Sequence, residues 1–316
     1  MEQNRKKERK RIKPADFVYL GAVVLMLVIA LRYETKKTTD YELSLGDEVT
    51  FGTYRDEPIR WRVLKIHEDR FGRASKAVLV SSEILTMKAF DGAPSGLYGY
   101  DDEGVLWRIN DEKTIQDPAM QEYTHGTNDW SRSDIRTWLN SNQENVLYEG
   151  KGPVKKAMAE ESNSYAAEAG FLCGFTDEEQ EAIIPTHNIT KGNILSEGDV
   201  ETDDLVYLLS EEELEWFYDA NISIYAPPTK QAVEQDRTHS YQTFSLNYGI
   251  DAYVWRLREP VDGYSSLSYS VNNGYSDKRL IQCVAAVECY GIRPAVTIDV
   301  KKFSDIMEEQ LQAQQK

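Results

Sequence analysis

Histidine and cysteine are scarce in this chain of 316 residues, which contains four histidines and three cysteines. The histidines stand singly, and neither His-Glu-x-x-His nor Cys-x-x-Cys occurs, so the sequence offers no zinc signature. It also lacks a Gly-x-Ser-x-Gly elbow, a P-loop and a Gly-x-Gly-x-x-Gly turn. Those motifs mark hydrolases, NTPases and dinucleotide-binding enzymes, and these classes therefore have no support in the sequence.

Cationic residues are also in the minority, with 36 Lys and Arg against 53 Asp and Glu, so the net charge is −17. Seven of the cations stand in the first 13 residues, which leaves the remainder of the chain still more acidic. An acidic surface repels the phosphates of nucleic acids, which argues against a nucleic-acid partner. It favours solubility, cationic partners or bound divalent cations.

One long apolar run follows the basic N-terminus. It extends over Phe17–Leu31 without a charge, and at roughly 1.5 Å per helical residue it reaches about 22 Å. The hydrocarbon core of a bilayer is about 30 Å thick. The rings of Tyr19 and Tyr33, with Lys13 and Arg32 reaching the interface, extend the run far enough to span the bilayer.

We therefore expect a single-pass membrane protein of the cell surface, with its N-terminus in the cytoplasm and its C-terminal domain outside the cell. The expected segments are a basic cytoplasmic segment (1–14), a transmembrane anchor (15–33), a linker (34–42), an extracellular domain (43–303) and a polar tail (304–316). Two alternatives stay open. The run is a signal peptide cleaved after Ala30, which releases the domain, or it is a buried core helix.

Short apolar stretches predict that the domain begins with strands. Ile59, Trp61 and Val63 alternate with Arg60 and Arg62, which predicts a strand with one buried face in an antiparallel meander. The other expected strands lie at 49–52, 77–81, 205–209, 253–257, 280–287 and 292–298.

Capping residues mark the expected helices. Ser131 or Ser133 can cap a helix that buries Ile135, Trp138 and Leu139 on one face. The other expected helices are one over 154–169 that Gly170 ends, one from a capping box at Thr176 through Ile184, one from a capping box at Ser210 that buries Leu214, Phe217 and Tyr218, and a polar helix or frayed end over the tail.

Strands first, helices in the middle and short strands last predict an α+β fold with a mixed or mainly antiparallel sheet. The segments 86–129 and 219–252 are loops much longer than about 15 residues, a length that is uncommon and often functional. We therefore expect the binding surface in these two segments.

Five sequence steps follow one another in a characteristic order. They are Trp130-x-x-Ser133-x-Ile135-Arg136-x-Trp138-Leu139-Asn140, Phe175-Thr-Asp-Glu-Glu179, Asp204-Leu-Val-Tyr-Leu-Leu-Ser210-Glu-Glu-Glu213, Trp255-Arg-Leu-Arg258-Glu-Pro260 and Gly291-Ile-Arg-Pro-Ala295. In this order they resemble an uncharacterised domain family of Gram-positive bacterial surface proteins, over residues 43–300. Glu259 stands where that family has serine, and the insert at 141–174 is longer than the family pattern.

The resemblance implies a relation to the C-type-lectin-like superfamily. It therefore implies a compact C-type-lectin-like α+β fold with two helices and long irregular loops. The superfamily also includes formylglycine-generating enzymes, which use a cysteine pair with copper, although no motif here matches theirs. A surface enzyme of that kind is the alternative function, with Cys283 or Cys289 as the metal ligand. Fold alone carries no activity.

Three further features each allow two interpretations, two of them concerning binding and one concerning a disulfide bridge. The acidic stretch Asp199–Asp204 can hold calcium, or it is a solvated loop. The aromatic stretches 241–255 and 264–275 can stack on sugars or peptides, or they pack in the interior. Cys283 and Cys289 can form a bridge, or they stay buried thiols.

Six polar and aromatic residues of the motifs invite assignment as a site, but we interpret them as structural. The tryptophans are expected to pack, and the arginines to bond to carboxylates or loop carbonyls. The six are Trp130, Arg136, Trp138, Asn140, Arg258 and Arg293. The sequence thus names no catalytic, cofactor-binding, metal-binding or ligand-binding residue. The favoured function is a non-catalytic, membrane-anchored binding or scaffold module for a protein or glycan, without a cofactor.

Overall fold

The computed structural model describes residues 42–148, 154–159, 165, 168–236, 252–272 and 281–314, without the side chains of 281–285 and 314. The first strands form the expected antiparallel meander of β1 (Glu48–Tyr54), β2 (Glu57–Glu68) and β3 (Ala74–Ser81). In β2 the alternating residues Ile59, Trp61 and Val63 are buried, as predicted.

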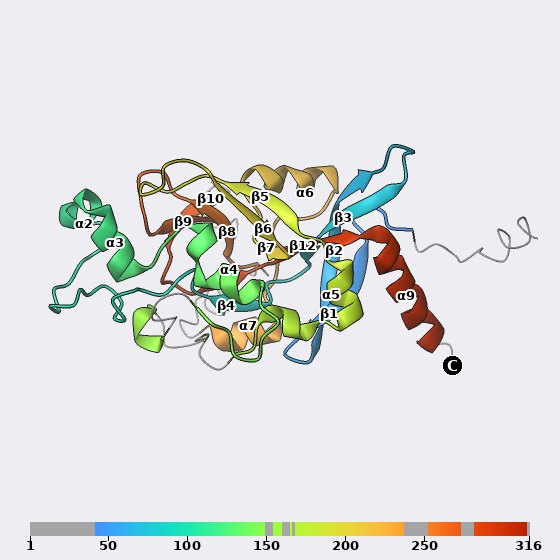
Figure 1. Ribbon diagram of the computed structural model, residues 1–316, viewed down its shortest axis with the longest axis horizontal. Coiled ribbons are helices and arrows are strands. Elements are labelled where there is room, and N and C mark those ends of the chain that lie inside the picture. The colour runs from blue at the N-terminus through green and yellow to red at the C-terminus, as the bar shows by residue number, and fades with distance from the viewer. Residues whose placement is uncertain are drawn as a thin grey trace, which may run out of the picture.

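Two five-stranded sheets and one hairpin organise the domain (Figure 1). The first sheet has the order β1-β2-β3-β12-β7, with β12 (Ala295–Asp299) and β7 (Val206–Tyr207). The second has the order β10-β9-β8-β11-β4, with β10 (Ile281–Ala285), β9 (Leu267–Val271), β8 (Trp255–Pro260), β11 (Tyr290–Ile292) and β4 (Thr86–Lys88). The hairpin pairs β5 (Thr186–Thr190) with β6 (Val200–Asp204).

Among the strands that the structure describes, every pairing is antiparallel except that of β11 with β8, which is parallel. Short helices surround the sheets, and their bounds are α2 (Glu112–Gln116), α3 (Pro118–His125), η1 (Trp130–Arg132), α4 (Asp134–Leu139), η2 (Lys155–Ala157), η3 (Phe171–Gly174), α5 (Asp177–Ala182), η4 (Glu212–Leu214), α6 (Glu215–Asp219), α7 (Lys230–Gln235) and α9 (Val300–Gln314). The expected mixed α+β fold with antiparallel sheets and few helices is confirmed.

The predicted helix caps form. The Ser133 hydroxyl accepts the Arg136 amide at the start of α4, and Thr176 and Glu179 form a reciprocal capping box at α5. Ser210 and Glu213 exchange the same pair of bonds before η4. These side chains satisfy amides that have no partner within the first turn of a helix.

Two helix predictions are wrong in part. Instead of a helix over 154–169, the described residues there hold only the single turn η2, and Met158 leaves it in an extended conformation. The helix expected after Ser210 forms as η4 followed by α6, and Leu214 and Phe217 are buried as predicted. Tyr218, which was also expected to be buried, is 71% exposed. Because α6 is only about one turn long, its buried face has room for fewer side chains than the i, i+3, i+4 pattern suggested.

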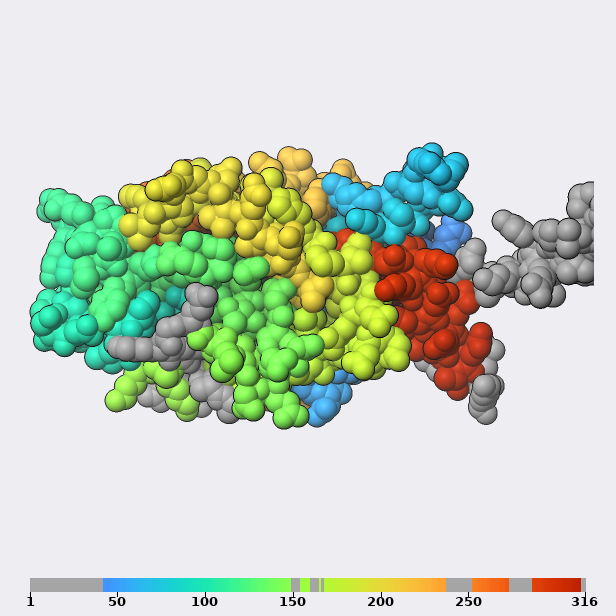
Figure 2. Space-filling view, viewed as in Figure 1, coloured from blue at the N-terminus to red at the C-terminus, as the bar shows by residue number. Residues whose placement is uncertain are grey.

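The expected polar tail belongs to a packed helix. Helix α9 continues across residue 303, the expected end of the domain, and buries Phe303 and Met307. Phe303 meets the ring of Phe51 from β1 edge to face, with 5.4 Å between the centroids. The first described residues and α9 thus lie at one end of the molecule, and α2 with α3 lies at the opposite end (Figures 1 and 2).

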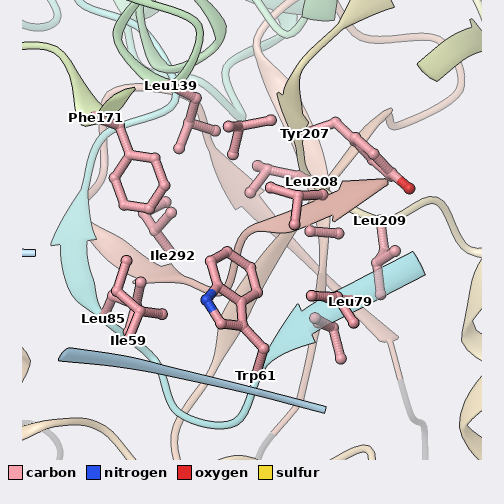
Figure 3. Packing of buried hydrophobic residues seen from close by; sticks show 14 of the residues in the cluster. Ile59, Trp61, Leu79, Leu85, Leu139, Phe171, Tyr207, Leu208, Leu209 and Ile292 are labelled. Carbon is pink, nitrogen blue, oxygen red and sulfur yellow. The ribbon is translucent and has the colours of Figure 1, made fainter. Parts of the chain in front are cut away.

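The core lies where the two sheets meet. Trp61 is fully buried, and its Nε1 donates to the Phe51 carbonyl at 2.7 Å. Figure 3 shows Trp61 among buried side chains from both sheets, including Leu79 of β3 and Ile292 of β11. One hydrophobic cluster therefore joins the meander to the later strands.

The expected anchor lies outside the described residues, as do the basic segment before it and the linker up to residue 41. Within the ranges that the structure describes, no helix is both long and apolar enough to cross a membrane. The membrane anchor therefore stays a prediction from sequence.

Gly52 provides a test of the packing between β1 and η3. Gly52 has φ +66°, and a Cβ at this position would lie 2.3 Å from Cε1 of Phe175. We expect Gly52→Ala to lower the free energy of unfolding by roughly 2 kcal/mol more than the left-handed backbone alone costs, because the buried ring has to move. Urea unfolding measures this difference.

The matched control is Gly104→Ala, since Gly104 has φ +75° and no atom within 4 Å of the added Cβ. Equal losses in the two variants would contradict the packing argument.

Candidate functional site

A cleft of about 1630 Å³ lies beside the first sheet. Its lining comes from β5 of the hairpin, from the turn and helices that follow β7, and from the ends of β8 and β3. These segments stand far apart in the sequence, and the pairing of β12 with β3 and β7 brings them together. The cleft is therefore a product of the tertiary fold.

Hydroxyl groups and an arginine form the buried part of the lining. Thr186 and Thr297 share a hydrogen bond of 2.6 Å between their Oγ1 atoms, and the Tyr207 hydroxyl lies 3.3 Å from Thr297 Oγ1. Arg258 donates to the Leu208 carbonyl at 2.9 Å and pairs with both carboxylate oxygens of Glu213. These bonds hold the polar lining in one arrangement.

The charged lining is strongly acidic. Three cations, Lys76, Lys191 and Arg258, face eight carboxylates. The eight carboxylates belong to Glu68, Asp199, Glu211, Glu212, Glu213, Glu215, Glu259 and Asp262. Two of the three cations are already paired, Arg258 with Glu213 at 2.5 Å and Lys191 with Asp262 at 2.6 Å. An excess of negative charge therefore faces the open space.

Glu259 lies within this acidic lining. Its carboxylate accepts the Glu211 amide at 2.5 Å. Burial is the largest cause that raises the pKa of Glu259; the Glu211 amide and Arg258 lower it, and Glu213 and Glu211 raise it further. The raised pKa reflects a carboxylate that is poorly solvated and has like charges beside it.

The hairpin that lines the cleft is held by one buried carboxylate. Asp204 is fully buried and accepts hydrogen bonds from Trp130 Nε1 at 2.9 Å, Arg136 Nε at 2.6 Å, Asn188 Nδ2 at 2.9 Å and Thr202 Oγ1 at 2.7 Å. Four donors are about as many as one carboxylate accepts, so its charge is compensated inside the protein.

These contacts bear on the two alternatives for the acidic stretch Asp199–Asp204, a calcium site or a solvated loop. The stretch is largely the strand β6 and not a loop. Asp199, Glu201 and Asp203 are exposed to solvent, whereas Asp204 points inward to its four donors. Asp204 could bind calcium only by giving up those bonds. Within the described part of the chain there is no group of three His, Cys, Asp or Glu side chains placed to hold a metal ion.

The interpretation of the motif residues as structural agrees with their contacts. Besides Trp130 and Arg136, Trp138 donates to the Ala169 carbonyl at 3.0 Å, and Asn140 bonds the backbone of Val206 through both its oxygen and its nitrogen. Arg293 donates to the carbonyls of Ser81 and Ile224. Of the six, Arg258 alone also lines the cleft.

The described parts of the two long segments expected to bind do not line this cleft. None of its lining residues falls within 86–129 or 219–236, and residues 237–251 lie outside the described ranges. The aromatic stretch 241–255 lies mostly outside the described residues, whereas Tyr269 of the stretch 264–275 lines the cleft. The sequence signal that could have directed attention here was the dense acidic run from Glu211 to Glu215 beside the Ser210 cap.

The cysteines are only partly described. Cys173 is exposed. The side chain of Cys283 lies outside the described residues, and the bridge between Cys283 and Cys289 therefore stays a prediction.

A second polar cluster lies away from the cleft, at the start of α4. Asp91 and Asp134 are both buried and hydrogen-bond to each other. Asp91 accepts the amides of Thr127 at 2.8 Å and Asp134 at 3.1 Å, and Asp134 accepts the Gly92 amide at 2.9 Å. Burial raises the pKa of Asp91, to which the charge of Asp134 adds, and burial raises the pKa of Asp134 to about 6.

Fold and site together define an α+β domain with a large acidic cleft beside its first sheet. Residues 104–300 match the model of the family described as Domain of unknown function (DUF6273), and the chain belongs to this family. No curated protein and no solved structure matches the chain.

The role of Asp204 can be tested with its neighbour as the control. We expect Asp204→Asn to lower the free energy of unfolding by about 3–5 kcal/mol. The asparagine NH2 group would face N–H and O–H donors where the carboxylate has an acceptor oxygen, and Arg136 would lose its carboxylate partner. Chemical denaturation provides the measurement. Asp203, on the other face of β6, is 72% exposed in its side chain, and Asp203→Asn should change stability by less than about 0.5 kcal/mol.

The carboxyl pair predicts a pH dependence of stability. A carboxyl group whose pKa is raised in the folded state stabilises the fold fully below its unfolded pKa, and this contribution is lost as the pH rises through the folded value. The contribution of Asp134 to the free energy of unfolding should therefore fall as the pH rises from about 4 to about 6. We expect Asp134→Asn, which keeps a neutral partner for Asp91, to reduce that fall in denaturation midpoints.

Asp305→Asn removes the same charge from the exposed side of α9 and serves as the control for net charge. The same pH profile in Asp134→Asn and in the unaltered chain would show that the raised pKa of Asp134 is not the cause of the fall.

Proposed function

We propose that this chain is a membrane-anchored extracellular binding module and that the acidic cleft is its ligand site. The observation that carries the proposal is the size of the cleft, about 1630 Å³. Sites for single small molecules measure about 300–1,000 Å³. A larger cleft fits an extended ligand, such as a stretch of peptide or an oligosaccharide.

The bonding within the lining supports recognition as its role. Arg258, Glu213, Thr186 and Thr297 are fixed by mutual hydrogen bonds, and Asp204 ties the hairpin to η1 and α4. A lining held in place before the ligand arrives loses little conformational entropy on binding. It suits a module that binds without chemical change to the ligand.

The fold agrees with this proposal in its coarse features. We assign it to the C-type-lectin-like class because of its mixed sheets, short helices and long irregular connections, which the sequence steps from Trp130 to Ala295 also suggest. With an anchor at 15–33, the end that carries β1 and α9 would face the membrane and the end with α2 and α3 would project away from it (Figure 1).

A filled cleft tests the binding role. Ile189 lines the cleft with 57% of its surface exposed, so Ile189→Trp adds bulk there with little cost to the fold. We expect this variant of the full chain, in detergent micelles, to lose at least about tenfold in affinity for peptides or glycans that an array identifies as ligands of the unaltered chain, since each 1.4 kcal/mol of lost contact is tenfold.

The matched control is Ile115→Trp, at an exposed position on α2 outside the cleft. Undiminished binding by Ile189→Trp would count against the cleft as the site. Stoichiometric copper in the purified chain, together with turnover of a bound substrate, would favour the alternative of a surface enzyme.

A further inference from the structure

The charge of the cleft restricts the chemistry of what it can bind. Its eight carboxylates outnumber its three cations, and two of those cations are engaged in ion pairs within the lining. An anionic ligand would meet repulsion from this lining. A neutral ligand would leave the carboxylates crowded, whereas a cationic ligand would relieve their mutual repulsion.

The most buried part of the acidic lining shows this crowding directly. Glu259 stands next to Glu213 and Glu211, and burial with these like charges raises its pKa. Arg258 is shared between Glu213 and the Leu208 carbonyl. A positive group from outside would therefore add charge compensation that the lining does not itself supply.

The floor of the cleft supplies an observation that is independent of the acidic residues. Arg258 is 3% exposed, and its Nε has no hydrogen-bond partner within the described residues. Beside it lie the hydroxyls of Thr186, Thr297 and Tyr207, which both donate and accept. Arg258 Nε itself is closed to solvent, so the hydroxyls of the lining are the groups that can bond to a ligand oxygen from the cleft.

Carbonyl oxygens and positive charges occur together in a basic peptide. We propose that the ligand of the cleft is an extended peptide segment rich in lysine or arginine, an inference that rests on the proposed binding function. Its carbonyl oxygens face the hydroxyls of the lining, and its cationic side chains reach the exposed carboxylates. A polyamine carries the charge without the carbonyl oxygens, and a neutral glycan carries oxygens without the charge.

The experiment measures fluorescence polarisation of a labelled hexalysine peptide with the full chain in detergent micelles. Glu212 and Glu215 line the cleft, are exposed, and make no hydrogen bond or ion pair through their carboxylates among the interactions described. We expect Glu212→Gln/Glu215→Gln to weaken binding at least about fivefold, since two exposed ion pairs are lost. Added salt should weaken binding to the unaltered chain.

The matched control is Glu178→Gln/Glu309→Gln, which removes two exposed charges from α5 and α9 and should stay within about twofold of the unaltered chain. Spermine should bind more weakly than hexalysine, and fully acetylated hexalysine should not bind. Equal affinity in the two double variants would overturn the proposal, because the attraction would then come from net charge alone.

A further outcome separates this inference from the proposed function. If a neutral oligosaccharide or the acetylated peptide binds and Ile189→Trp blocks it, the cleft is a ligand site and the inference of a basic peptide is wrong. If Ile189→Trp leaves every probe bound as before, the cleft is not the site and both proposals fail.

Discussion

Arg293 is the residue on which the junction of the two sheets depends. It stands between β11 of the second sheet and β12 of the first, and it is almost fully buried. Its guanidinium donates to the carbonyls of Ser81 and Ile224 and lies over the rings of Phe217 and Trp255 at 4.8 and 5.2 Å. Burial lowers its pKa to about 9. A cation in this place is held by carbonyl dipoles and ring faces, so both sheets must form before it is satisfied.

A second buried ionic centre extends this junction toward the cleft. Asp204 joins the β5–β6 hairpin to Trp130 and Arg136, and Asn140 bonds the backbone of β7. The cleft depends on both contacts, because the hairpin and the segment after β7 form much of its lining. Trp130, Arg136 and Asn140 therefore position elements that line the cleft. Membership of a family of unknown function adds no ligand to this description, so the proposals rest on the geometry and charge of the cleft.

Local patterns were enough for much of the fold. The alternation of Ile59, Trp61 and Val63 predicted a buried strand face, and Ser133 and Thr176 cap helices because their hydroxyls reach amides within the next turn. The prediction of a helix over 154–169 was wrong, because the described residues there form only the single turn η2. Helical periodicity in a sequence does not show whether a surface exists against which the helix can pack. The acidic stretch was predicted correctly as solvated at Asp199, Glu201 and Asp203, which are exposed, but not at Asp204. Four donors, most of them from distant segments, allow the Asp204 carboxylate to be buried.

By itself the sequence determined the acidic character, the α+β order of elements and the capped helices. These properties depend on composition or on residues a few positions apart, and both can be read directly from the sequence. The tertiary structure alone decided where the cleft lies, that Glu259 faces Glu211 and Glu213 within it, and that Asp91 and Asp134 meet in the interior. Such contacts join residues up to 48 positions apart in the case of Glu211 and Glu259. They depend on sheet order and chain crossing, and no local pattern encodes either of these.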